Sequence, residues 1–271
     1  MLTLLPTPIG NIADITFRTL ETIKNANLIL CEDTRVTKSL LNILKDRYNL
    51  SLPKADFLSF HEHNGKERLE QIGSRLKDGN VIYLSDAGMP VISDPGQLLV
   101  EYCQKEGIEY DVLPGASAAP LIYAASGFES GKFYFYGFLP SKGKQRSDEL
   151  NKILNNGLDT IIYEAPHRII KLIEQICQID ENRELFVAKE LTKKYQKYYR
   201  LEAKELLDKL KQNSIKGEWA VVIKGKSKES KTLSLDEILS LDIPPKAKAK
   251  ILSKLTGKSV KECYNELRME N

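Results

Sequence analysis

Short apolar runs alternate with longer amphipathic stretches over residues 1–126, and this alternation constrains the fold more than any other feature of the chain. The apolar runs predict strands at 2–5, 28–31, 57–60, 81–84 and 109–113. The amphipathic stretches predict helices at 16–26, 36–46, 65–77, 95–106 and 116–125, with Thr16 capping the first. Because strands that alternate with helices pair in the same direction, we expect a mainly parallel sheet with helices on both faces.

A second α/β region follows a joint at 127–131. We expect strands at 133–138, 160–163, 185–189 and 218–224 and helices at 146–155, 166–178 and 203–213, in a sheet that need not be all parallel. Residues 225–234 have the polar composition of a linker, and three short helical patterns follow at 235–241, 246–255 and 259–269. The predicted domains are an N-terminal α/β domain at 1–126, a second α/β domain at 127–225, and a linker with a small basic helical domain at 226–271.

The composition excludes several classes of protein. Of 271 residues, 42% are hydrophobic and 28% are charged, and the net charge is +3. No apolar run approaches the roughly 18–20 residues of a membrane span, and residues 1–10 lack the basic start and long apolar core of a signal peptide. The four cysteines are far apart and form no CxxC pair, which argues against a zinc knuckle or a disulfide framework. We therefore expect a cytoplasmic protein with no membrane partner.

Polar residues gather where the predicted strands end. Residues 83–96 read YLSDAGMPVISDPG, so an apolar strand stops in a segment rich in aspartate, proline and glycine. Proline lacks the N–H that pairing needs, and glycine admits backbone conformations that other residues avoid. Further polar strand ends lie at 7–11, 31–35, 60–64, 114–118, 163–168 and 190–193. Since open α/β sheets bind ligands outside the carboxyl ends of their strands, we expect a cleft between the two α/β domains.

The common nucleotide and metal motifs are missing from this sequence. Neither GxGxxG nor GxxxxGK[ST] occurs, which removes the main support for a dinucleotide site or a P-loop. His61 and His63 could bind a metal with Glu32 or Asp86, but a histidine pair two residues apart matches no strong metal spacing. We therefore predict no metal site. Each strand end, taken alone, also fits a turn, a helix cap or an ion-pair network within 32–35.

Lysines concentrate in two stretches of the chain. Residues 246–261 hold six lysines and no acid, and residues 193–200 (KKYQKYYR) interleave cations with tyrosines. Cations can neutralise phosphates and tyrosines can stack on bases, so both stretches are candidates for binding nucleic acid. Two solvated helix faces explain the same patterns equally well.

Taken in order, the motifs TPIGN, CEDTR, HEHN, SDAGMPVISDPG, PGASA, YEAPHR, ELTK and GEWAVVIKG closely resemble the tetrapyrrole methylase superfamily. Within that superfamily, the set is similar to the branch that methylates ribosomal RNA. Relatives that modify porphyrins carry Gly-Asp-Pro where this chain has Ser85, Asp86 and Ala87. The resemblance runs from residue 1 to about 225, and the tail at 235–271 resembles the small helical C-terminal domain of the same branch.

The resemblance implies a fold, an activity and partners. It implies an α/β protein in which two α/β domains bind S-adenosylmethionine in the cleft between them, and a homodimer. The implied activity is 2′-O-methylation of a cytidine ribose in the decoding region of 16S ribosomal RNA, within the small ribosomal subunit.

Carried over by position, the resemblance also implies which residues contact the cofactor. They are Pro8, Asp86, Ala87, Gly88, Met89, Ile92, Ser117, Ala118, Tyr163, Leu191 and Ala220. One departure from the family stands out. An acid usually follows ELTK closely, where this chain has Tyr195, Gln196 and Lys197, so we assign no base to that segment.

The chemistry of the implied reaction calls for a base and for cations. A ribose hydroxyl is a weak acid, so a base at the cleft would assist its reaction. The candidates are Glu32, Asp33, Glu62, His63, Glu164 and Lys193, among which we favour Glu32 and Glu62 as catalytic residues. Long cations suit phosphate contacts, and the predicted RNA-binding residues are Arg35, Arg168, Lys193, Lys246, Lys248 and Lys250.

Other functions remain open on the same residues. One is a methylase of a porphyrin-like small molecule, which the Ser-Asp-Ala-Gly sequence and the basic tail disfavour. Another is a non-catalytic RNA-binding protein on the same fold, which would leave the polar strand ends without a role. A metal hydrolase built on His61 and His63 ranks lowest.

Overall fold

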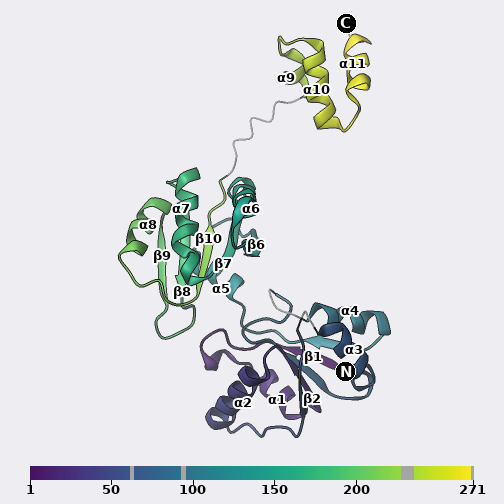
Figure 1. The fold of residues 1–271 in the computed structure, drawn as a ribbon, viewed down its shortest axis with the longest axis vertical. Helices are drawn as coiled ribbons and strands as arrows, with labels where there is room; N and C mark the ends of the chain where they lie inside the picture. Colours follow the sequence, from purple (N-terminus) through teal and green to yellow (C-terminus); the bar gives the residue numbers. More distant parts are fainter. Residues whose placement is uncertain (62–63, 93–95, 227–234, 270–271) are drawn as a thin grey trace. The chain divides into compact units, whose positions relative to one another are not determined.

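The computed structural model describes residues 1–61, 64–92, 96–226 and 235–269 (Figure 1). The chain forms two compact units, Met1–Lys226 and Ser227–Asn271. The larger unit contains two five-stranded sheets with helices packed on them, and the smaller contains the last helices. The predicted α/β fold with a helical C-terminal region is therefore confirmed. The predicted domain boundary at residue 126 stays a prediction.

The first sheet is parallel throughout, as predicted. Its strands are β1 (Leu2–Leu5), β2 (Leu28–Cys31), β3 (Asp56–Ser59), β4 (Val81–Leu84) and β5 (Tyr110–Val112), in the order β3-β2-β4-β1-β5. Leu84 at the end of β4 lies opposite Cys31 on one side and Leu5 on the other. The loops that follow β1, β2 and β4 therefore begin together at one edge of the sheet.

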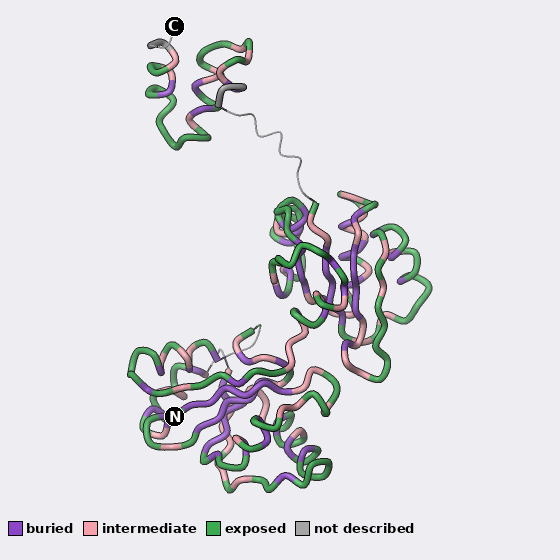
Figure 2. Tube along the Cα trace, turned by 180° about the vertical axis from the view of Figure 1, so that it is seen from behind, coloured by how far each residue is buried: buried purple, intermediate pink, exposed green. Residues whose placement is uncertain are grey.

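Helices cover both faces of the first sheet because successive strand side chains point to opposite sides. Leu4 packs on the side of the helices at 65–78 and 97–106, whereas Leu5 packs on the side of the helices at 17–24 and 34–48. The three central strands β1, β2 and β4 are buried throughout, whereas the edge strands β3 and β5 are partly or fully exposed (Figure 2). Thr16 caps the first helix as predicted, since the Thr19 N–H donates to its Oγ1 over 3.1 Å. The helices are α1 (Phe17–Lys24), α2 (Thr34–Tyr48), α3 (Gly65–Asp78) and α4 (Gln97–Glu106).

The second sheet is mixed, as the sequence allowed. Its strands are β6 (Phe133–Phe138), β7 (Asp159–Glu164), β8 (Glu184–Lys189), β9 (Lys197–Glu202) and β10 (Trp219–Ile223), in the order β6-β7-β10-β8-β9. Only β6 and β7 pair in parallel. One face packs against α6 (Gly143–Asn155), α7 (Ile169–Ile179) and α8 (Ala203–Lys211). The opposite face packs against α5 (Ala118–Ser126), which starts at the edge of the first sheet.

Strand β9 corrects the interpretation of residues 193–200 as a solvated helix face. Residues 197–202 pair antiparallel with β8 along its whole length. Tyr199 and Leu201 pack on the core of the second sheet, while the Tyr198 ring lies 5.4 Å from the Phe186 ring on the other face. The pattern of cations and tyrosines is therefore the two-residue alternation of an edge strand.

The smaller unit is built from α9 (Leu235–Ser240), α10 (Pro245–Thr256) and α11 (Val260–Met269). Ile238, Ala249, Leu252 and Cys263 form its core. Gly257 ends α10 with φ +73°, the left-handed conformation that glycine adopts most easily. No described helix of the chain has both the length and the apolar character needed to cross a membrane.

Candidate functional site

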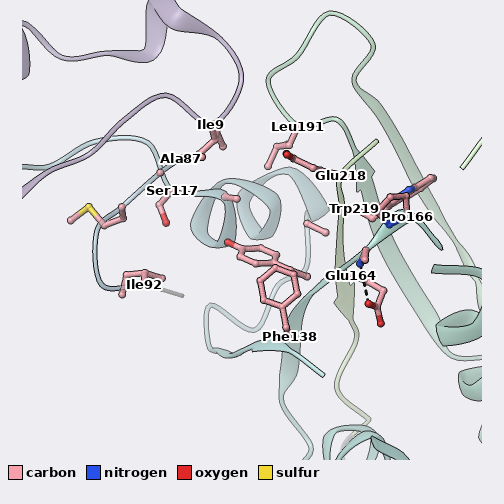
Figure 3. A pocket seen from close by; sticks show the side chains of 17 residues that line it. Ile9, Ala87, Ile92, Ser117, Phe138, Glu164, Pro166, Leu191, Glu218 and Trp219 are labelled. Carbon is pink, nitrogen blue, oxygen red and sulfur yellow. Dashed lines mark hydrogen bonds between the residues drawn. The ribbon is translucent and has the colours of Figure 1, made fainter. Parts of the chain in front are cut away.

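An apolar pocket of about 290 Å³ lies between the loops of the first sheet and the strand ends of the second (Figure 3). The loop after β1 contributes Ile9, the turn after β4 contributes residues 87–89 and 92, and the start of α5 contributes Ser117 and Ala118. The second sheet contributes Phe138, residues 163–166, Ala188, Leu191 and residues 218–220. We call this cavity the apolar pocket.

Most of the predicted cofactor residues come together around the apolar pocket. Those that line it are Ala87, Gly88, Met89, Ile92, Ser117, Ala118, Tyr163, Leu191 and Ala220. Pro8 and Asp86 instead line a neighbouring hollow of about 690 Å³ along α2, which we call the α2 hollow. The two cavities share Ile9, Ala87 and Glu218. The binding role of these residues stays a prediction.

The turn after β4 is fixed to the loop after β1 by main-chain hydrogen bonds. Thr7 and Gly88 exchange two of them, each 3.0 Å long, and the Ser85 Oγ donates to the Gly88 carbonyl over 2.8 Å. Gly88 has φ +87°, and a Cβ at this position would lie 3.1 Å from Ile9 Cγ2. Glycine therefore serves both the backbone conformation and the close approach of Ile9.

The start of α5 brings backbone N–H groups to the apolar pocket. Ser117 precedes the first turn, and its side chain makes no capping hydrogen bond. The first N–H groups of a helix lack partners within the helix and favour an anionic group nearby. Gly115 packs so tightly that a Cβ there would lie 2.6 Å from the Pro6 Cβ. The small residues of 114–118 thus allow tight packing, and they also leave main-chain atoms accessible at the edge of the apolar pocket.

The loop after β8 contacts the loop after β1 just as closely. A Cβ on Gly10 would lie 2.5 Å from Lys193 Cγ, and the Asn11 N–H donates to Thr192 Oγ1 over 3.2 Å. Thr192 has φ +66°, unusual for a β-branched residue, and its N–H donates to Gln196 Oε1 over 2.5 Å. Within the segment 195–197, where the resemblance led us to expect an acid, Gln196 offers a neutral amide oxygen that accepts from the Thr192 backbone.

Carboxylates gather where β2 and β4 end. The Asp33 N–H donates to Asp86 Oδ1 over 3.3 Å, which ties the two strand ends together. Burial, followed by the negative charge of Asp86, raises the pKa of Glu32, and burial likewise raises the pKa of Asp86. The Arg35 side chain, followed by its backbone N–H, lowers the pKa of Asp33 to about 2 by hydrogen bonding. Raised pKa values make Glu32 and Asp86 better proton acceptors than Asp33.

Two of the other candidate bases, Glu62 and His63, lie outside the described residues. Asp86 lines the α2 hollow, whereas Glu32 lines neither that hollow nor the apolar pocket as described. The described residues contain no group of three or more histidine, cysteine, aspartate or glutamate side chains placed to hold a metal ion.

Glu164 lines the apolar pocket (Figure 3), but its carboxylate is already paired with two arginines. Its Oε2 lies 2.7 Å from Arg146 Nη2, and its Oε1 lies 2.6 Å from Arg168 Nε and accepts from the Ala165 N–H over 2.9 Å. The side chains of Glu164 and Arg146 are 0% and 1% exposed. Two guanidinium groups therefore occupy the oxygens of this carboxylate. The positive charge of Arg168 is therefore paired inside the protein and is not displayed at the surface.

The other predicted RNA-binding cations differ in their surroundings. Arg35 pairs with Asp33 over 2.6 Å, yet its side chain is 89% exposed. Lys193 lies 3.2 Å from a Glu190 carboxylate oxygen and 2.9 Å from one of Glu218. Arg35 and Lys193 both line the α2 hollow.

The three predicted lysines of α10 belong to the smaller unit. Lys246 and Lys250 are exposed. Lys248 is half-buried, and its Nζ donates to the Leu239 carbonyl over 2.6 Å, which satisfies a carbonyl at the end of α9. Lys248 therefore contributes to the structure of this unit.

Sequence reasoning missed several residues of the apolar pocket. Ile9 lies inside the TPIGN motif, and Phe138 is the last residue of a predicted strand. Both would have been found if every residue at a predicted strand end had been counted as a candidate for the site. Trp219 could have been found in the same way, because it opens β10. Ala188 lies within β8 and carries no signal of its own.

Residues 1–207 match the family model described as Tetrapyrrole (Corrin/Porphyrin) Methylases. The chain belongs to the tetrapyrrole methylase family. Among curated relatives of this methylase, the Ribosomal RNA small subunit methyltransferase I of Helicobacter pylori is 42% identical, and the match covers 100% of this chain and 99% of the relative. Proteins of the same name from Campylobacter fetus and Thermotoga maritima are each 44% identical, covering 98% and 81% of this chain and 99% and 96% of the relatives.

Two solved structures show the same fold. A cobalt precorrin-4 methyltransferase superposes with a TM-score of 0.60 at 17% identity, covering 82% of this chain and 94% of the other. A diphthine synthase superposes with a TM-score of 0.61 at 13% identity, covering 82% and 89%. Their low identity limits the likeness to the fold.

Proposed function

We propose that this protein uses S-adenosylmethionine to methylate the ribose 2′-hydroxyl of a cytidine in the decoding region of 16S ribosomal RNA, within the small ribosomal subunit. The observation that carries the proposal is the apolar pocket at the joined strand ends of a tetrapyrrole methylase fold. Relatives 42% to 44% identical, whose names specify small-subunit ribosomal RNA, support this choice of substrate.

The residues around the apolar pocket fit S-adenosylmethionine. When bound, this cofactor supplies a methyl group already activated by a positively charged sulfur. Leu191, Phe138 and Ala220 offer apolar surface for an adenine ring. The turn at 87–89 presents backbone rather than bulky side chains, and the start of α5 offers N–H donors to a carboxylate.

The chain's own task is to align the ribose hydroxyl and to accept its proton. Alignment at about 3–3.5 Å and exclusion of water account for most of the rate in such a reaction. Glu32 is the proposed base, because burial and the neighbouring Asp86 raise its pKa and so increase its affinity for a proton. Glu62 remains a second candidate.

The partners follow from the distribution of charge. Arg35 and Lys193 beside the apolar pocket, and the exposed Lys246 and Lys250 of the smaller unit, would contact RNA phosphates. Lys193, Arg168 and Lys248 have partners within the protein, so we expect smaller contributions from these three than from the exposed Arg35, Lys246 and Lys250. We further propose a homodimer in the cytoplasm.

Methyl transfer to isolated small subunits tests the proposal. With labelled S-adenosylmethionine and subunits from cells lacking the modification, we expect label at a single cytidine, located by mass spectrometry of RNA digests. Calorimetric titration with the cofactor alone separates an enzyme from a non-catalytic RNA-binding protein. Incorporation only into a porphyrin-like acceptor, or no incorporation by protein that binds the cofactor, would contradict the proposal.

A further inference from the structure

An apolar stripe runs along the exposed side of α2. Val36, Leu40 and Ile43 follow the i, i+4, i+7 spacing of one helix face. Val36 is 41% exposed and Ile43 is 44% exposed, although side chains of this kind are usually covered. All three line the α2 hollow together with Ile12.

The rim of the α2 hollow is polar on the side of the strand ends. Asp33 and Asp86 supply carboxylate oxygens, and the low pKa of Asp33 keeps it ionised near neutral pH. Arg35 precedes the first residue of the apolar stripe and holds its guanidinium in solvent. The hollow therefore combines an apolar floor, hydrogen-bond acceptors and an exposed cation.

The α2 hollow and the apolar pocket meet along a common border. Ile9, Ala87 and Glu218 line both cavities, and Asp86 lines the hollow immediately before Ala87. A group bound in the hollow can therefore reach a group bound in the pocket across Ala87.

We propose that the α2 hollow is the subsite for the target nucleoside, an inference that rests on the proposed function. The base lies on Val36, Leu40 and Ile43, because a base taken out of its stack is held against apolar side chains. The ribose lies at the Ala87 border, where its hydroxyl faces the end of the hollow that Asp86 lines, beside Glu32. Arg35 contacts a flanking phosphate.

A nucleoside fits this hollow better than a second copy of the chain. Its planar base, its hydroxyl-bearing sugar and its anionic phosphate match the apolar stripe, the Asp86 end and Arg35 in turn. The border shared with the apolar pocket is needed for methyl transfer to a bound nucleoside. An interface between two copies of the chain would not require the hollow to share a border with the apolar pocket.

The paired substitution Val36→Ser with Ile43→Ser tests the subsite. The matched control is Leu158→Ser with Ile179→Ser, since these side chains are 43% and 46% exposed and line neither cavity. We expect the α2 pair to raise the KM for unmodified small subunits about tenfold, because each serine removes apolar surface that would be buried against the base. The Kd for S-adenosylmethionine, measured by calorimetry, stays unchanged in both pairs.

A second substitution tests the subsite without changing the apolar residues of α2. Arg35→Ala should lower the salt-dependence slope of subunit binding by about 1, whereas Arg35→Lys retains it. An α2 pair that behaves like the control pair overturns the subsite, while continued methylation by the unaltered protein leaves the proposed function standing. If the α2 pair loses self-association while its KM for small subunits stays unchanged, the stripe is an interface between copies of the chain. That outcome also overturns the subsite. If the unaltered protein transfers no methyl group, both proposals fall together.

Discussion

Asn11 and Thr192 are 181 positions apart in the sequence, yet the Asn11 N–H donates to Thr192 Oγ1 over 3.2 Å. The bond joins the loop after β1 to the loop after β8. Ile9 and Leu191, which line the apolar pocket, lie within two residues of its two ends. The bond therefore sets the separation of two walls of the proposed cofactor site.

Thr192→Val should weaken S-adenosylmethionine binding about fivefold, the usual effect of losing one neutral hydrogen bond. Thr192→Ser keeps the hydroxyl and should bind as the unaltered protein does. Calorimetry with the cofactor measures the difference. Equal affinity of the valine and serine variants would show that the bond does not position the pocket.

Gly88→Ala should lose both stability and cofactor affinity. The left-handed backbone conformation costs a residue with a Cβ about 1–2 kcal/mol, and the new Cβ would press on Ile9. Gly107→Ala is the control, because Gly107 has φ +65° with nothing within 4 Å of its Cβ position. We expect thermal melts to show a loss in both variants and calorimetry to show weaker cofactor binding only in Gly88→Ala. Equal cofactor affinities of the Gly88→Ala and Gly107→Ala variants would show that the contact between residue 88 and Ile9 does not shape the cofactor site.

Glu32→Gln should lower the activity of the protein and raise its stability at neutral pH. A raised carboxylate pKa means that the folded state holds its proton more tightly than the unfolded state, so the free energy of unfolding falls as pH rises through that window. At neutral pH the glutamine removes a partly buried charge and its repulsion with Asp86, which should raise stability while kcat falls. Near pH 3, where the carboxyl is protonated, we expect the two proteins to be equally stable. Chemical denaturation at both pH values and single-turnover methylation give the comparison, and an unchanged kcat would rule out Glu32 as the base.

Arg146→Met should destabilise the larger unit by about 3–5 kcal/mol, because it removes one partner of a buried ion pair. Arg168→Ala should cost less, since its side chain is 20% exposed and Arg146 still neutralises Glu164. Urea unfolding of both variants tests this order. A larger loss for Arg168→Ala would mean that Arg168, rather than Arg146, chiefly holds Glu164.

Two lysines of α10 should respond in opposite ways to replacement by alanine. Lys250→Ala should lower the salt-dependence slope of subunit binding and leave the melting of the smaller unit unchanged, because this side chain is exposed. Lys248→Ala should lower the melting temperature, since its Nζ holds the Leu239 carbonyl. Binding at several salt concentrations, with melts of the full chain, distinguishes them. Full salt dependence after removal of 227–271 would show that the smaller unit takes no part in RNA binding.

The central strands of the first sheet were predictable because each is a short, mainly apolar run between glycine, proline and polar residues. Leu28–Cys31 and Val81–Leu84 are buried throughout and carry that signal without interruption. Strand β9 was missed because only its inward residues, Tyr199 and Leu201, are apolar, while its outward residues are charged or aromatic. An edge strand with one solvated side offers a weaker pattern than a central one.

The candidate site was predictable at the level of loops but not of contacts. Motifs at strand ends marked nine residues that now line the apolar pocket. No pattern distinguished Arg168, which pairs with buried Glu164, from Arg35, which stays in solvent. The difference depends on burial, and burial depends on what packs above each side chain.

By itself, the sequence determined the order of helices and strands apart from β9, the polar strand ends and the resemblance to a methylase family. These depend on local spacing and on motifs, which a single chain displays directly. Only the tertiary structure decided that Asp86 belongs to the α2 hollow, that Thr192 holds Asn11, and that Gln196 supplies an acceptor to Thr192. Such relationships arise when parallel strands bring the ends of distant segments to one edge, where burial and hydrogen bonding fix each side chain.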